Sequence, residues 1–161
     1  METLEELQHW YCFEYGAQKE LASGTIDTYY STLEKFKSFF GPEYKIKDLS
    51  GKDLNRFKTH ANGKTSTIRQ NLNNLNTALL VSIKKKKWVS ISAWLDSNPF
   101  DEITLAQDKK PKTRVLSEEE EDLLFQNTPA YIKPIITIAL CTGLRVSDIL
   151  SLKWSMIDRE N

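Results

Sequence analysis

The longest regular pattern in this sequence spans residues 65–88, TSTIRQNLNNLNTALLVSIKKKKW. Its apolar side chains recur at steps of three and four residues, which predicts a helix with one buried face. That stripe consists of Ile68, Leu72, Leu75, Leu79 and Ile83. We expect the stripe to pack against other helices, so the predicted fold class is all-α, a helical bundle.

The opposite face of this helix is rich in amide side chains. The residues expected to point outward there are Lys64, Thr65, Ser66, Arg69, Gln70, Asn73 and Asn74. Asn and Gln can pair with the edge of adenine, and Arg can bind guanine or a phosphate. An ordinary exposed helix face carries Glu and Lys more often, because they are stronger helix formers. The pattern therefore indicates contact with DNA, while contact with another protein stays open as an alternative.

The charge distribution supports a polyanionic partner. The formal net charge of the chain is zero. Residues 51–114, however, hold thirteen Lys and Arg against five Asp and Glu, a net charge of +8. The flanking segments, residues 1–50 and 115–161, each have a net charge of −4. A basic middle between two acidic ends predicts one electrostatic face for double-stranded DNA.

Turn signals divide the rest of the chain into further predicted helices. They are expected over residues 4–21, from Ser23-Gly24-Thr25 to about Phe40, over 51–60 after a Ser50 cap, after Ser117, and up to about Cys141. No alternating strand pattern, internal repeat or low-complexity segment accompanies them. Most of the core is therefore expected to come from helix packing.

The predicted helix that ends near Phe40 has a hydroxyl-rich face. This face carries Thr28, Ser31, Thr32 and Lys35. Hydroxyl and ammonium groups suit phosphate oxygens, and they suit solvent equally well. From this face we take Thr28 as a candidate DNA contact.

The sequence predicts two parts joined by a linker. Residues 1–105 form the helical bundle, residues 106–114 a polar, proline-broken linker, and residues 115–161 a second helical part. Lys112 and Arg114 of the linker could follow a phosphate backbone, or the linker could act only as a tether. In the second part, the apolar residues at 123–125 and 135–140 are expected in the core.

Composition excludes several classes of protein. No apolar run approaches the roughly 18 residues of a membrane span, and the acidic N-terminus lacks the apolar region of a signal peptide. Cys12 and Cys141 lie in apolar helical contexts, which indicates reduced, buried thiols in a cytoplasmic protein. His9 and His60 have no partners at metal-ligand spacing, so no metal site is expected.

A second informative stretch spans residues 142–158, TGLRVSDILSLKWSMID. Thr142-Gly143 predicts a turn, and Ser147 is expected to cap a short helix with Arg145 at its entrance. Backbone N–H groups and a guanidinium at this place suit a phosphate. Asp148 is expected to pair with Arg145. Burial is expected for Leu144, Ile149, Leu152 and Trp154. A turn with a locally paired arginine is the purely structural alternative.

This stretch resembles the segment of the first catalytic arginine in the tyrosine recombinases, the phage-integrase family. Residues 23–100 look like the family's SAM-like core-binding domain, and residues 115–119 look like the start of its catalytic domain. The resemblance implies DNA strand exchange without a cofactor, in which a tyrosine attacks the scissile phosphate. It also implies that Arg145 is the first arginine of that site, supported by Asp148.

The chain departs from the family pattern after Arg145. No tyrosine and no histidine follow it, and Lys153 comes too early for the family's lysine. The resemblance therefore implies a fragment of a recombinase that binds DNA, together with other protomers, but does not cleave it alone. Two alternatives remain. One is a stand-alone module that occupies recombination sites without cleavage, and the other is a helical protein-interaction domain.

Overall fold

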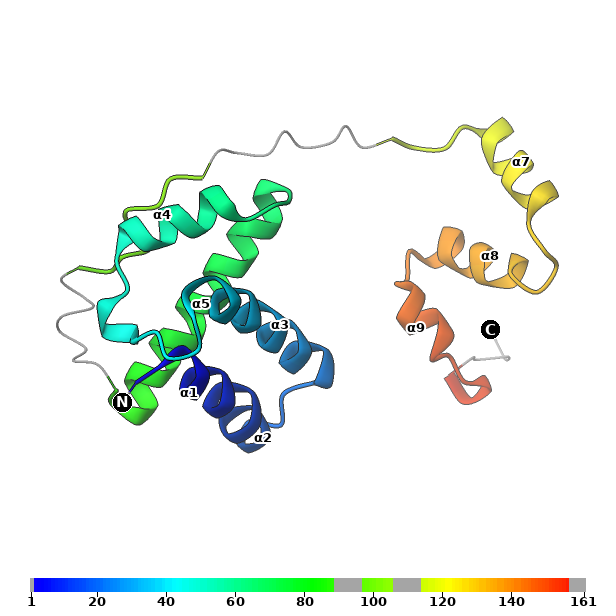
Figure 1. Cartoon of the computed structure of the whole chain (residues 1–161). Coiled ribbons are helices and arrows are strands. Elements are labelled where there is room, and N and C mark those ends of the chain that lie inside the picture. The colour runs from blue at the N-terminus through cyan, green and yellow to red at the C-terminus, as the bar shows by residue number, and fades with distance from the viewer. Residues whose placement is uncertain (1, 89–96, 106–113, 157–161) are drawn as a thin grey trace. The chain divides into compact units, whose positions relative to one another are not determined.

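The computed structural model describes residues 2–88, 97–105 and 114–156. Within these ranges the chain forms helices and one isolated antiparallel bridge, between Thr3 and Lys45 (Figure 1). The predicted all-α fold class is confirmed. The chain divides into two compact units, Met1–Lys109 and Lys110–Asn161. The assignment of these units to a core-binding and a catalytic domain stays a prediction.

The first unit begins with a helical segment of three parts. These are α1 (Leu4–His9), the π-helix η1 (Trp10–Tyr15) and α2 (Gly16–Gln18). Thr3 and Glu6 form a capping box at its start. The helix predicted over residues 4–21 is therefore shorter than expected, since the chain leaves it at Lys19 and reaches a left-handed φ of 50° at Glu20.

The next four elements complete the first unit. They are α3 (Ser23–Phe40), the short 3-10 helix η2 (Ile46–Asp48), α4 (Gly51–His60) and α5 (Thr65–Lys86). Gly41 ends α3 with a φ of 96°, a backbone conformation that suits glycine. Ser50 caps α4, because its hydroxyl accepts from the N–H of Asp53 while the Asp53 carboxylate accepts from the N–H of Ser50.

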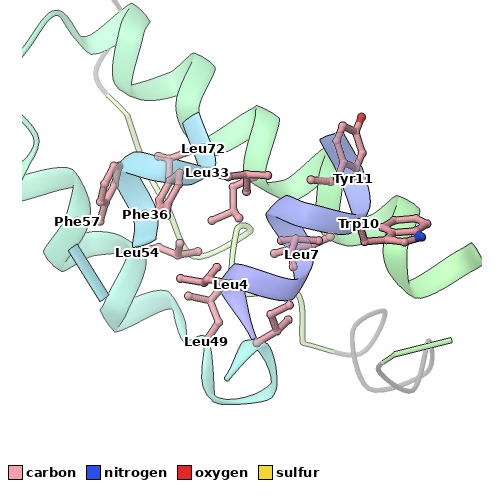
Figure 2. Packing of buried hydrophobic residues seen from close by; sticks show 14 of the residues in the cluster. Leu4, Leu7, Trp10, Tyr11, Leu33, Phe36, Leu49, Leu54, Phe57 and Leu72 are labelled. Atoms are coloured by element: carbon pink, nitrogen blue, oxygen red, sulfur yellow. The ribbon is translucent and has the colours of Figure 1, made fainter. Parts of the chain in front are cut away.

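One hydrophobic core joins α1, η1, α3, α4 and α5. The predicted stripe on α5 lies in it, with all five of its residues buried. The rings of Phe36 and Phe57 stack with centroids 4.0 Å apart, and Figure 2 shows them next to each other with Leu54 and Leu72 nearby. Burial of aromatic and aliphatic side chains is the main source of stability for such a bundle.

Residues 97–105 pack back onto α4. A Cβ atom added to Gly51 would lie 1.9 Å from the Glu102 carboxylate, so a larger residue at this helix start would require the Glu102 side chain to move. Lys58 donates a hydrogen bond to the carbonyl of Thr104 at 2.6 Å. The expected packing of Trp94 and Leu95 lies outside the described residues.

The second unit contains α7 (Glu118–Asn127), α8 (Lys133–Thr142), α9 (Val146–Leu150) and the 3-10 helix η3 (Trp154–Met156). Ser117 and Glu120 form a capping box at the start of α7, where a helix was predicted to begin. Gly143 ends α8 in the left-handed region, with a φ of 67°. The sequence therefore predicted these helices with good accuracy.

Burial in the second unit differs from expectation. Ile149 is its buried hydrophobic residue among those described, whereas Leu144, Leu152 and Trp154 are exposed, Trp154 by 76%. Leu123, Leu124 and Leu140 are also exposed. The prediction of burial is therefore confirmed for Ile149 and wrong for these six exposed residues, because a few short helices cannot cover all of their apolar faces.

In the described part of the chain, no helix combines the length and apolar character needed to cross a bilayer.

Candidate nucleic-acid interface

The N-terminal half of α5 carries most of the residues predicted to contact DNA. Lys64 precedes the helix as its N-cap residue and is exposed, and no side-chain hydrogen bond caps the first turn. Ser66, Gln70 and Asn73 are exposed, while Thr65 and Arg69 are half-buried. The structure therefore presents a mixed polar and basic surface at the start of this helix.

Asn74 does not belong to that surface. Its side chain is only 5% exposed, and the prediction that it points outward is wrong. Its Nδ2 donates to the hydroxyl of Thr32 on α3 at 3.1 Å, and its Oδ1 accepts from Nε2 of Gln70 at 2.8 Å. The apolar pattern of the sequence predicted one buried row of residues on α5. The structure shows a second buried row, which consists of small and polar residues. This second row is Asn71, Asn74, Ala78 and Ser82.

The hydroxyl-rich face of α3 is also narrower than predicted. Thr32 is 2% exposed and forms part of the contact with α5. Thr28 is exposed, but its hydroxyl donates to the carbonyl of Gly24 at 2.7 Å. Thr28 would have to give up this bond to donate to a phosphate, although its oxygen can still accept a hydrogen bond.

A groove lies where α3, α4 and the start of α5 meet. Its volume is about 610 Å³. Phe39, Phe57 and Ile68 form its apolar part, and polar side chains surround them. The polar residues include Ser31, Lys35, His60, Asn62, Thr67 and Asn71. Amide, hydroxyl and cationic groups from three helices, together with the Glu34 carboxylate, thus line one groove.

A second, more open hollow lies along α4. It has a volume of about 720 Å³ and shares Phe39 and His60 with the groove. Lys52 and Arg56 line it, and the Arg56 side chain is 72% exposed and forms an ion pair with Asp53 at 3.4 Å. The shared residues make the two hollows neighbours, so the basic surface continues from α5 to α4.

Sequence reasoning did not name the residues that α4 and its following turn add. Lys52, Arg56, His60 and Asn62 were not among the candidate DNA contacts. Neither were Lys35 of α3 and Asn71 of α5, which line the groove. The charge of +8 over residues 51–114 was the available signal, because Lys52 and Arg56 belong to that segment. Their place beside the groove depends on how α4 packs, which local periodicity does not reveal.

The lysines at the end of α5 have structural interactions of their own. Lys86 pairs with Glu14 at 3.1 Å, and its ammonium lies 5.4 Å and 5.8 Å from the ring centroids of Trp10 and Trp88. Lys84 and Lys85 are exposed in the last turn, where positive charge complements the helix dipole. A structural role is sufficient to explain this cluster.

Arg145 is the N-cap residue of α9, and its side chain is exposed. The prediction that Ser147 caps this helix is wrong, because Ser147 lies in its first turn. Among the described residues, Arg145 and Asp148 form no ion pair; their link is a backbone hydrogen bond of 2.9 Å from Asp148 N–H to the Arg145 carbonyl. The backbone at Arg145 is extended, as is usual for an N-cap residue, and its side chain makes no capping hydrogen bond.

The two linker candidates have different outcomes. Arg114 forms an ion pair with Glu120 at the start of α7. Lys112 lies outside the described residues. The cysteines differ as well: burial raises the pKa of the Cys12 thiol to about 11, whereas Cys141 is exposed, against the expectation of burial. The described residues hold no group of side chains that could bind a metal.

The N-terminal unit matches the family model of the phage integrase SAM-like domain over residues 9–104. This span is more than half of the chain. The chain belongs to the phage integrase SAM-like domain family. Comparisons with curated proteins and with solved structures return no significant match.

The integrase match contains the whole groove and the second hollow. It runs from the end of α1 through α3, α4 and α5 to Thr104. Arg145 lies outside it, so the likeness of residues 142–158 to a recombinase segment rests on the sequence pattern alone. The integrase assignment of residues 9–104 therefore rests on a family match, whereas that of residues 142–158 rests on a short sequence pattern.

Proposed function

We propose that this integrase SAM-like domain binds double-stranded DNA as part of site-specific recombination. The family match over residues 9–104 carries the proposal. The binding surface is the N-terminal half of α5 together with the groove and the hollow along α4. Its proposed contacts are Thr28, Lys35, Lys52, Arg56, Lys64, Thr65, Ser66, Arg69, Gln70 and Asn73.

The chemistry of this surface suits a duplex. Lys64 stands at the positive end of the dipole of a 22-residue helix, where backbone N–H groups favour a phosphate. Lys35, Lys52 and Arg56 supply further positive charge around the groove. Gln70 and Asn73 are exposed amides that can reach base edges in the major groove. Cations would thus fix the register while amides read the sequence.

The second unit has a separate place in the proposal. Residues 115–161 would be the beginning of a recombinase catalytic domain, with the exposed Arg145 available for a phosphate. A trapping experiment with a suicide duplex should give no covalent adduct of this chain, because no tyrosine follows Arg145. We also propose that the protein acts in the cytoplasm and meets other recombinase protomers on DNA.

One observation favours the alternative of a protein-interaction domain. Phe13 and Tyr30 are exposed by 55% and 43%, and their rings meet edge to face with centroids 6.2 Å apart. Exposed aromatic pairs are common at protein interfaces. Tyr30 also lines the groove, so a protein and a DNA duplex would compete for part of this surface.

Salt-dependent binding tests the proposal. Affinities of the 161-residue chain for several duplexes should fall with salt at a log–log slope of about −3 to −4, as expected for roughly four phosphate contacts. Lys64→Ala should weaken binding evenly across sequences and reduce the slope by about one. Lys19→Ala, the same charge change at an exposed residue after α2, is the matched control.

Each outcome of this experiment is decisive. Binding that ignores salt, or that responds equally to Lys64→Ala and Lys19→Ala, would remove the α5 surface from the interface. Arg69→Ala should cost about 1–3 kcal/mol on selected duplexes if Arg69 reads a base. An even loss across sequences would assign Arg69 to a phosphate instead.

A further inference from the structure

Four side chains form a hydrogen-bonded relay between α5 and α3. Gln70 donates from Nε2 to Oδ1 of Asn74 at 2.8 Å, and Asn74 donates from Nδ2 to the hydroxyl of Thr32 at 3.1 Å. The Thr32 hydroxyl in turn donates to Oδ1 of Asn71 over a longer contact of 3.5 Å. Every donor points the same way along the relay, so each central group uses both its donor and its acceptor.

The relay is buried at its centre and open at its ends. Thr32 and Asn74 are 2% and 5% exposed, whereas Gln70 lies on the surface. Asn71 is nearly buried, yet it lines the groove. A buried polar group that loses its partner is strongly disfavoured, because no water replaces the bond. The centre of the relay therefore holds its end residues in fixed orientations.

The direction of the relay determines what Gln70 presents to solvent. Its Nε2 donates to Asn74, so its carbonyl oxygen Oε1 lies at the opposite edge of the planar amide group, directed away from Asn74. That oxygen accepts hydrogen bonds. In the major groove, adenine N6 and cytosine N4 are donors, while guanine O6 and thymine O4 are acceptors. A fixed outward acceptor therefore favours bases with an exocyclic amino group.

We propose that Thr32, Asn71 and Asn74 are positioning residues that hold Gln70 so that its Oε1 reads an amino-bearing base edge. The inference rests on the proposed DNA binding and adds a specificity mechanism to it. A side chain held in place before binding loses less conformational entropy in the complex. Asn73 is exposed on the same helix without a comparable anchor, which makes it the natural comparison.

Selection from a pool of randomised duplexes tests the proposal. The 161-residue chain should enrich one base pair at the position that Gln70 contacts, with a preference of about tenfold that is lost when an analogue without the exocyclic amino group replaces the adenine or cytosine of that pair. Gln70→Ala and Thr32→Val should both lose the preference at that base pair. Thr32→Ser keeps the hydroxyl and should retain it, and Asn73→Ala should leave this base pair unaffected. Asn74→Ala removes the acceptor that holds Gln70 and should also abolish the base preference.

The ratio of affinities for two duplexes separates positioning from stability. A variant that is partly unfolded binds both duplexes less by the same factor, so the ratio stays constant. In ¹⁵N-labelled protein, the side-chain amide signals of Gln70 should move toward free-amide positions in Thr32→Val and stay in place in Thr32→Ser. This readout needs no DNA.

The possible failures are distinguishable. If the parent chain binds no duplex, the proposed function fails and the reading role fails with it. If the parent is selective and Thr32→Val and Asn74→Ala keep that selectivity while Gln70→Ala loses it, the relay is overturned and DNA binding stands. Because every Watson–Crick pair contains one amino-bearing and one keto base, the amino group is tested alone by replacing the adenine or cytosine of the selected pair with an analogue that lacks it. Selectivity that survives this replacement would also overturn the assigned direction.

Discussion

Asn74 on α5 donates a hydrogen bond to the hydroxyl of Thr32 on α3 across 3.1 Å, with both side chains almost wholly buried. The two residues are 42 positions apart in the sequence. The bond therefore joins the helix proposed to read DNA to the helix beside it. Its loss should affect folding as well as recognition.

Asn74→Ala should destabilise the first unit by about 1–3 kcal/mol, because the buried Thr32 hydroxyl loses the N–H donor that it accepts from and keeps only its longer bond to Asn71. Asn73→Ala, an identical change at the exposed neighbouring position, should stay within about 0.5 kcal/mol. Urea unfolding of both variants and the parent measures the difference. Equal losses of stability in the two variants would indicate that Asn74 is exposed, as the sequence pattern had predicted.

The sequence predicted elements whose signals are local. Helices were predicted to begin after Ser50 and Ser117 because a serine before a helix is a local signal, and both residues form capping boxes. The α5 stripe was recognised because apolar residues repeat every three or four positions. These signals need no knowledge of the partner helix.

The misplacement of Asn74 and Thr32 has the opposite cause. Each is polar, and each is buried only because the other provides its hydrogen-bond partner. A pattern based on apolar residues assigns both to the surface. The π-helical turn at Trp10–Tyr15 and the position of Lys52 beside the hollow along α4 have the same cause. Both depend on how helices pack, which a short stretch of sequence does not reveal.

The α4 cap should make stability depend on acidity. The pKa of Asp53 is held below its ordinary value of 3.8, first by the hydrogen bond from the Ser50 side chain and further by the Tyr44 hydroxyl and by Arg56. A lowered pKa means that the folded state favours the charged carboxylate. The stability from Asp53 is therefore complete above the unfolded pKa and is lost as the pH falls through the lower folded pKa.

Asp53→Asn should remove this part of the acid sensitivity. Unfolding in urea at pH 7 and at pH 3 should show a larger loss of stability for the parent than for the variant. Ser50→Ala should cost about 1 kcal/mol at pH 7, as is typical for an N-cap. Equal losses in the parent and in Asp53→Asn would show that other carboxylates determine the acid response.

Asn76 on α5 offers a stabilising substitution. Its Oδ1 is buried and has no hydrogen-bond partner among the described residues. Asn76→Ala removes this unpaired carbonyl and improves helix propensity, so we expect stability to increase by about 1 kcal/mol. Asn73→Ala gains the same propensity at an exposed position and isolates the effect of burial. A loss of stability in Asn76→Ala beyond that of Asn73→Ala would mean that the carbonyl is paired.

Arg145 is a poor choice for the start of a helix. It is the N-cap residue of α9, yet its side chain makes no capping hydrogen bond and is exposed. Ser at this position can accept from a first-turn N–H, which typically stabilises a helix by about 1 kcal/mol relative to a side chain that does not cap. Serine at position 145 would therefore stabilise α9 better than the arginine that is present.

Arg145→Ser should accordingly slow amide exchange at Ser147 and Asp148 by roughly fivefold, the equivalent of about 1 kcal/mol. Arg145→Ala should change stability by less than about 1 kcal/mol, as is usual for an exposed side chain. Hydrogen exchange of the 161-residue chain measures both, and Ser151, at the other end of α9, serves as an internal reference. Faster exchange in both variants, or a loss near 3 kcal/mol, would make Arg145 a structural residue. Retained stability would leave binding of an anion such as phosphate as the reason for a guanidinium at this position.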